Sequence, residues 1–159
     1  MMLGLLSEME EAVIEKSIGI NAGPDRVWKV LTVPALMLQW MGEPEMKLEV
    51  VTQWKVGLPL VIRGVHHLLF ENRGIVLAAD PGRRLQYSQL SSLSRLEEED
   101  SNYSVFEFLL TPDGTQTRLS LTIKGFPADT IYRHLAFYWN TTVLKIKQVA
   151  ESEAADALV

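Results

Sequence analysis

The sequence predicts an α+β domain in which a curved antiparallel sheet of about six or seven strands wraps round a long C-terminal helix. Three observations carry this prediction. Apolar and polar residues alternate along the middle of the chain, turn residues divide that stretch into segments, and a long amphipathic stretch follows it. The chain of 159 residues fits one domain. We place this domain at residues 12–151, with a disordered tail at 1–11 and a frayed end at 152–159.

The first elements expected are one strand and two short helices. Three isoleucines share one face of a strand at about residues 12–20, as a half-buried strand requires. Pro24 suits the first position of a helix, because the N–H that proline lacks would have no helical partner there. Pro34 ends this helix and opens a second one that runs through Trp40.

Six further strands are expected before the final helix. Gly57 and the segments 80–82 and 112–115 carry the glycine, proline and aspartate residues that are typical of turns. Phe106 and Phe108 would face one side of their strand and Glu107 the other, which is typical of an antiparallel sheet with one buried face. The expected strands are residues 46–52, 58–65, 73–79, 84–90, 103–111 and 116–124.

The last element expected is a helix at about residues 128–151. Its apolar residues recur at three- and four-residue steps and form one stripe. A sheet with one apolar face needs a cover, and only this helix is long enough to provide it. Side chains or a ligand would fill the space between a curved sheet and one helix. The stripe comprises Ile131, Leu135, Tyr138, Thr142, Ile146 and Val149, widened by Trp139 and Val143.

Short segments along the chain share their order and spacing with a known superfamily. The main ones are residues 20–24, 54–59, 63–64, 74–76, 84–87, 91–94 and 138–140. Together they resemble the START-like (SRPBCC) superfamily, and more narrowly the branch related to the C-terminal domain of the activator of the heat-shock protein 90 ATPase. The resemblance spans about residues 13–151. It implies the cavity-bearing helix-grip fold, and a superfamily of lipid carriers, polyketide cyclases and co-chaperone domains.

Composition excludes several classes of function. Net charge is −5 and no run of Lys and Arg forms a basic stripe, so we expect no nucleic-acid partner. The chain has no cysteine, which excludes disulfides, thiolate metal sites and cysteine nucleophiles. No stretch reaches the roughly 20 apolar residues of a membrane span. We expect a cytoplasmic protein without a cofactor.

The histidines do not suggest a metal site. His66 and His67 are adjacent, so on a strand they would point to opposite faces and would not bind one ion together. We place them in or near a hairpin turn. His134 lies on the final helix, beside the apolar stripe. We therefore assign no metal ligand and no catalytic residue.

Eight residues are predicted to line a ligand cavity between the sheet and the final helix. In such a cavity the hydroxyls of Tyr87 and Tyr138 would orient the ligand. The alternative for each residue is packing in the core, where aromatic side chains are common. The predicted lining residues are Trp40, Trp54, Tyr87, Phe106, Phe108, Leu135, Tyr138 and Trp139.

Three functions remain open. The preferred one is a non-catalytic carrier or sensor of a small hydrophobic molecule, such as a lipid. The second is a cyclase- or hydrolase-like enzyme, which needs an acid or base beside the ligand; the candidates are His66, His134, Tyr87 and Tyr138. The third is an interaction module, either a homodimer or a chaperone contact, built on outward-facing apolar residues. Those residues are Val61, Val65, Ile75 and Leu77.

Overall fold

The computed structural model describes residues 12–152; the tail predicted at 1–11 and the end predicted beyond Ser152 lie outside the described residues. The helices are α2 (Pro24–Thr32), α3 (Pro34–Trp40) and α4 (Asp129–Ala150). The strands are β1 (Val13–Ile20), β2 (Glu49–Thr52), β3 (Pro59–His66), β4 (Leu68–Asp80), β5 (Arg84–Ser91), β6 (Ser104–Asp113) and β7 (Gln116–Lys124).

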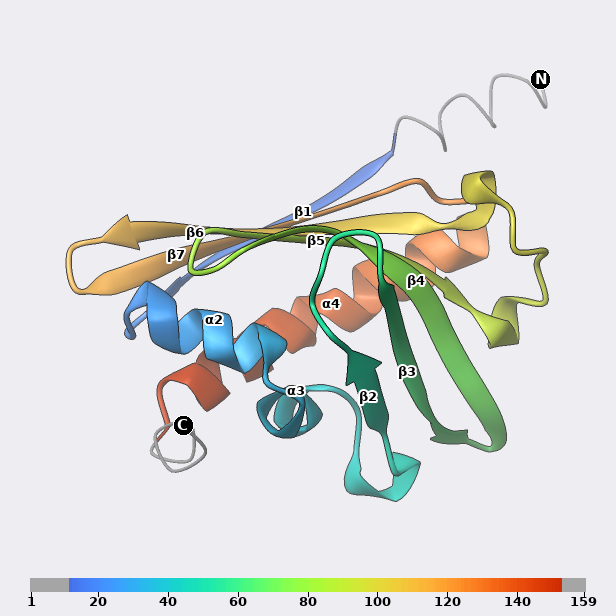
Figure 1. The fold of residues 1–159 in the computed structure, drawn as a ribbon, viewed down its shortest axis with the longest axis horizontal. Coiled ribbons are helices and arrows are strands. Elements are labelled where there is room, and N and C mark those ends of the chain that lie inside the picture. Colours follow the sequence, from blue (N-terminus) through green and yellow to red (C-terminus); the bar gives the residue numbers. More distant parts are fainter. Residues whose placement is uncertain (1–11, 153–159) are drawn as a thin grey trace.

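The strands form one antiparallel sheet in the order β1-β7-β6-β5-β4-β3-β2. Figure 1 shows the sheet bending at the β4-β3-β2 end, with α4 crossing beneath it and α2 and α3 beside α4. This arrangement confirms the predicted α+β helix-grip fold. Among residues 12–152, none of the helices combines the length and the hydropathy that a membrane crossing needs.

A close approach of β4 and β5 accompanies the bend of the sheet. A Cβ atom at Gly74 would overlap the backbone carbonyl of Ser88, so only glycine fits this position on β4. The register of the two strands then shifts between Val76 and Ala78. Bulges of this kind bend and twist a strand locally. The bulge therefore contributes to the bend that brings the β2-β3-β4 end of the sheet towards α4.

Two strands differ from their predicted extents. The strand expected at 46–52 begins only at Glu49, because Pro44–Met46 form a 3₁₀ turn and Lys47 has a left-handed backbone with φ 49°. The strand expected at 73–79 begins at Leu68. His66 pairs with Leu68 across a turn made by His67 alone, at φ 64°. The prediction that the two histidines lie in a hairpin turn is confirmed.

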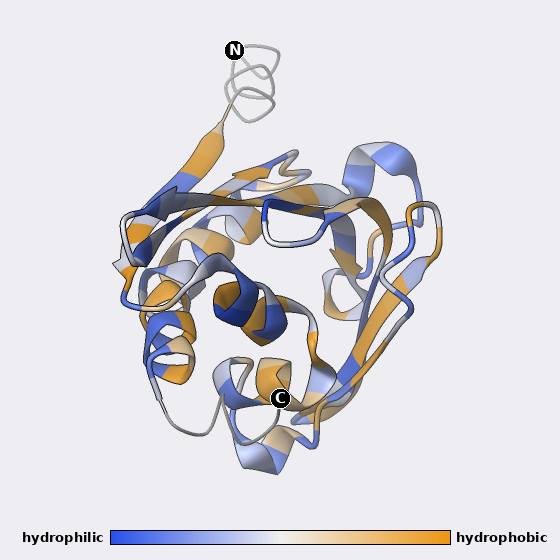
Figure 2. Cartoon of the chain, turned by 60° about the vertical axis from the view of Figure 1, so that its left-hand side comes forward, coloured by the Kyte–Doolittle hydropathy of each residue, from blue (hydrophilic) through white to orange (hydrophobic). Residues whose placement is uncertain are grey.

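The core lies between the inner face of the sheet and α4. Orange and blue bands alternate along the strands in Figure 2, as the one-sided burial of the sheet requires. The C-terminal half of the α4 stripe is buried, whereas Leu135 and Tyr138 in its N-terminal half are only half-buried. Burying one large apolar side chain contributes about 1.5–3 kcal/mol. The C-terminal half of α4 therefore holds the helix to the sheet.

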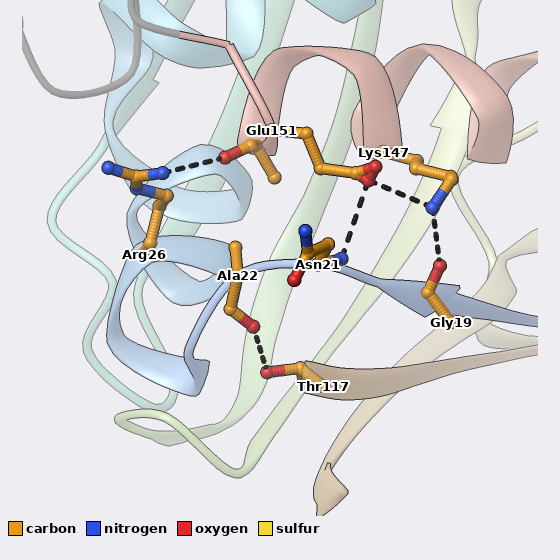
Figure 3. Close-up of polar contacts among 8 residues, drawn as sticks. Gly19, Asn21, Ala22, Arg26, Thr117, Lys147 and Glu151 are labelled. Carbon is orange, nitrogen blue, oxygen red and sulfur yellow. Dashed lines mark hydrogen bonds and ion pairs between the residues drawn. The ribbon is translucent and has the colours of Figure 1, made fainter. Parts of the chain in front are cut away.

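Polar contacts fix the end of α4 to the end of β1 (Figure 3). The Lys147 Nζ donates to the Gly19 carbonyl at 2.8 Å and pairs with the Glu151 carboxylate at 2.8 Å. The Lys147 hydrogen bond holds the pKa of Glu151 below its usual value. The Thr117 hydroxyl donates to the Ala22 carbonyl at 2.7 Å. These bonds secure the turn between β1 and α2.

Candidate functional site

Seven aromatic rings form a continuous group between the sheet and α4, which we call the aromatic cluster. The rings of Tyr87 and Phe106 stack, with centroids 5.4 Å apart and planes 13° apart. Phe106 and Phe108 each lie 5.9 Å from Trp139. The cluster comprises Trp40, Trp54, Tyr87, Phe106, Phe108, Tyr138 and Trp139.

Strand register explains why these rings meet. Tyr87 of β5 lies opposite Phe106 of β6, and Leu85 lies opposite Phe108, so these side chains share the inner face of the sheet. Trp139 of α4 packs on them from below, since it belongs to the apolar stripe that covers the sheet. The structure thus brings seven of the eight predicted residues into mutual ring contact. Leu135 packs, half-buried, against the same core.

Two indoles of the cluster also complete the C-terminal end of α2. In a helix, the N–H of the residue four positions later donates to each carbonyl. For the Val30 carbonyl that residue is Pro34, which has no N–H. The Trp40 indole nitrogen donates to that carbonyl instead, at 2.8 Å. The Trp54 indole nitrogen donates to the Thr32 carbonyl at 2.6 Å. These two rings therefore have a structural role, in addition to any contact with a ligand.

The hydroxyl of Tyr87 is the unusual group of the cluster. Tyr87 is 2% exposed, and the structure shows no hydrogen bond to its hydroxyl from residues 12–152. A buried tyrosine hydroxyl usually has a partner, because losing water without one is costly. Burial, and then the neighbouring Tyr138, raise the pKa of Tyr87 well above its ordinary value. The group is a neutral hydroxyl at pH 7.

Tyr138 differs from Tyr87 in being half-buried and hydrogen-bonded. Burial raises its pKa, while hydrogen bonds with the Thr142 side chain and the Gly42 backbone act in the opposite direction. The ring of His134 stacks on Tyr138 with centroids 6.2 Å apart, and His134 itself is exposed. Tyr138 therefore forms the edge of the aromatic cluster next to the more exposed N-terminal half of α4.

Asn72 is another inner-face polar residue, and it was not among the residues predicted from the sequence. Asn72 of β4 lies opposite Ile62, a core residue of β3, and its Oδ1 atom is buried without a hydrogen-bond partner. The expected strand began at Arg73, one residue after Asn72, whereas β4 begins at Leu68. A strand beginning just after the His66-His67 turn would have placed it on the inner face.

The remaining candidates lie on the surface. His66 and His67 are exposed, and their rings lie 4.9 Å apart rather than on opposite faces, because His67 forms the turn. Within the described residues, no three His, Cys, Asp or Glu side chains gather as metal ligands. Arg63 faces solvent, 3.6 Å from Glu71 and 3.9 Å from Glu49.

Two surface grooves lie outside the aromatic cluster. One, of about 400 Å³, follows the β3-β4 hairpin between Arg63, Val65, Leu69 and Phe70. The other, of about 220 Å³, lies over β1 and β7 beside Lys16 and Ser120. Neither groove reaches the rings, since neither is lined by a residue of the cluster. Their mixed polar and apolar linings do not suggest a particular ligand.

Comparison with protein families gives one match. The model of the family described as Activator of Hsp90 ATPase homolog 1-like protein matches residues 21–151. That range contains all seven rings and Asn72. No protein of curated function matches the chain.

Solved structures share the fold over most of their length. Protein ChR145 from Cytophaga hutchinsonii has a TM-score of 0.74 at 25% identity, covering 91% of this chain and 97% of that one. Protein CV1439 from Chromobacterium violaceum has a TM-score of 0.73 at 19% identity, covering 88% and 98%. CalU16 from Micromonospora echinospora has a TM-score of 0.64 at 19% identity, covering 91% and 79%.

Proposed function

The chain belongs to the activator of Hsp90 ATPase homolog 1-like family, and from this premise we propose that it binds a small hydrophobic ligand between the sheet and α4. In this proposal the protein is a non-catalytic carrier or sensor, and the aromatic cluster with Leu135 contacts the ligand. We also propose a cytoplasmic location, because a chain without cysteine is suited to a reducing compartment.

The observation that carries the proposal is the Tyr87 hydroxyl. The Tyr87 ring lies on the inner face of the sheet and packs against Phe106 and Phe108, and its hydroxyl has no hydrogen bond among the described residues. If Tyr87 served packing alone, phenylalanine would fill the same space without placing a hydroxyl that has no hydrogen bond in the core. A ligand that bonds to the hydroxyl explains why a tyrosine stands here. The surrounding rings suit an apolar ligand body.

Access to the cluster is best from the N-terminal half of α4. Leu135 and Tyr138 are half-buried there, whereas Trp139, Val143 and Ile146 on the following turns are buried. The rings of the cluster contact each other, so a ligand must displace side chains to enter. Displacement of half-buried residues at the end of a helix costs less than displacement of its buried turns.

An enzymatic function has weaker support. Tyr87 and Tyr138 do lie near one another, and burial raises the pKa of both. A raised pKa keeps each hydroxyl protonated at pH 7, so neither acts as a general base there. Both hydroxyls remain capable of donating a hydrogen bond. The proposal therefore gives them a binding role and assigns no catalytic residue.

The experiment is native mass spectrometry of the purified protein, followed by organic extraction. We expect a reproducible extra mass of a small molecule that extraction removes. Adding the extract back should change tryptophan fluorescence, because three tryptophans belong to the cluster. The matched control is a Phe137→Ala variant: Phe137 is exposed on α4, outside the cluster, and should bind equally. A protein that carries no molecule and binds none from a lipid extract contradicts the proposal.

A second candidate is a homodimer that forms through the β3-β4 hairpin. Leu68 is 61% exposed and Leu69 83% exposed, next to Val65 and the apolar side of the hairpin groove. The outer-face set is smaller than predicted, since Val61 is only 7% exposed and Leu77 is half-buried. Light scattering should show a dimer that Leu68→Ser with Leu69→Ser returns to a monomer. A monomer at every concentration contradicts it. A chaperone contact remains a proposal from the family alone.

A further inference from the structure

The inner face of the sheet carries two polar atoms without partners, and they lie at separate positions. One is the Tyr87 hydroxyl of β5, and the other is the Asn72 Oδ1 of β4. Directly paired residues share a face, and the partners of these two, Val76 and Ile62, both belong to the core. Both polar groups therefore point to the α4 side of the sheet.

The register gives the spacing of the two residues along the sheet. Tyr87 pairs with Val76 of β4, and Asn72 lies four residues from Val76 on the same strand. Four residues of an antiparallel strand span roughly 13 Å. Side chains stand roughly perpendicular to a sheet, so the two polar groups should also be well separated and would meet different ends of one molecule. The body between them would face apolar residues such as Ile62 and Val76.

No charged side chain is buried among the described residues. The buried polar residues among those described are Thr32, Ser88, Ser104, Thr117 and Thr142, and none of them ionises near pH 7. A charged ligand would lose its hydration without gaining an ion pair, which costs several kcal/mol. The ligand should therefore be neutral. At the Asn72 end a hydroxyl fits best, because it can donate to the amide oxygen.

Building on the proposed function, we propose that the ligand is a neutral, elongated apolar molecule with an oxygen group at each end. Tyr87 binds one oxygen and Asn72 binds a hydroxyl at the other. The two residues thereby select among apolar molecules that the aromatic cluster alone would accept equally. This selectivity is a property of two side chains and not of the fold.

The test uses three probes of one shape: biphenyl, 4-hydroxybiphenyl and 4,4′-dihydroxybiphenyl. Their affinities are measured by quenching of tryptophan fluorescence and by calorimetry. Each added hydroxyl should raise affinity about tenfold, since it gains a hydrogen bond to a group that has none within the described residues. Tyr87→Phe and Asn72→Leu should each remove about one tenfold step for the dihydroxy probe and leave biphenyl unchanged. Circular dichroism checks that both variants fold.

Tyr103→Phe is the matched control. Tyr103 precedes β6 and takes no part in the ring contacts of the cluster, so its hydroxyl should not affect any probe. Equal binding of all three probes, or an equal loss in Tyr103→Phe, overturns two-ended recognition and leaves the proposed function standing. Failure of the folded protein to bind any of the three overturns both.

Discussion

The indole nitrogen of Trp54 donates a 2.6 Å hydrogen bond to the backbone carbonyl of Thr32, the last residue of α2. Trp54 holds this position with φ at 50°, in the left-handed region that bulky residues rarely adopt. Such a conformation costs roughly 1–2 kcal/mol for a residue with a Cβ atom. The hydrogen bond, together with the contact between Trp54 and Tyr87, offsets this cost.

Replacing Trp54 or Trp40 with phenylalanine should therefore destabilise the protein. Each change keeps a ring but leaves a carbonyl of α2 without its donor, which costs about 1–3 kcal/mol. Urea unfolding at pH 7 measures the difference. Trp28→Phe is the control, because the structure shows no hydrogen bond from the Trp28 indole to residues 12–152. If all three variants lose the same free energy of unfolding, the indole hydrogen bonds of Trp40 and Trp54 do not account for the loss.

Gly74→Ala should be one of the most damaging small substitutions in the chain. The new Cβ would overlap the Ser88 carbonyl, which belongs to the neighbouring strand and cannot rotate away. Strands β4 and β5 would have to separate, so we expect a loss above about 3 kcal/mol or failure to fold. Gly23→Ala should stay within about 0.5 kcal/mol, because open space surrounds a Cβ there. Thermal unfolding compares the two; a mild Gly74→Ala contradicts the close approach.

Tyr87 should make the protein sensitive to alkali. Its pKa is raised in the folded state above the ordinary value of 10.0, so the folded state keeps a proton that the unfolded state releases. This contribution is fully present below about pH 10 and falls by at most about 1.4 kcal/mol per pH unit above it. Tyr87→Phe should flatten the dependence of unfolding free energy on pH between 10 and 12. At pH 7 the variant should be at least as stable, since no hydrogen bond is lost.

Thr117→Val should cost about 1–3 kcal/mol. The Thr117 hydroxyl is buried and donates to the Ala22 carbonyl. Valine has no hydroxyl, so this carbonyl would lose its hydrogen bond. Thr32→Val is the matched control, because the Thr32 hydroxyl bonds within its own helix to the Trp28 carbonyl. We expect that control to lose less than about 1 kcal/mol. Calorimetry measures the melting temperatures of both variants. Equal decreases would contradict a specific contribution of the bond between Thr117 and Ala22.

Local patterns were enough to predict most of the elements. Pro24 and Pro34 predicted the starts of both short helices, and the alternation around Glu107 predicted the buried face of β6. These signals act over a few residues, which is the range that a sequence pattern records. The start of β4 was wrong because one residue, His67, closes the hairpin. Nothing in an adjacent pair of histidines indicates so tight a turn.

The sequence by itself determined which residues are apolar at strand and helix spacing, and hence the sheet, its helical cover and seven rings that meet. Tertiary structure alone decided which polar atoms find partners. Trp40 and Trp54 direct their N–H groups to α2, while Tyr87 and Asn72 keep atoms with no partner on the inner face. Apolar burial follows a periodic pattern, but a hydrogen bond needs two groups to meet in space at one distance and angle. That meeting depends on every element packed between them.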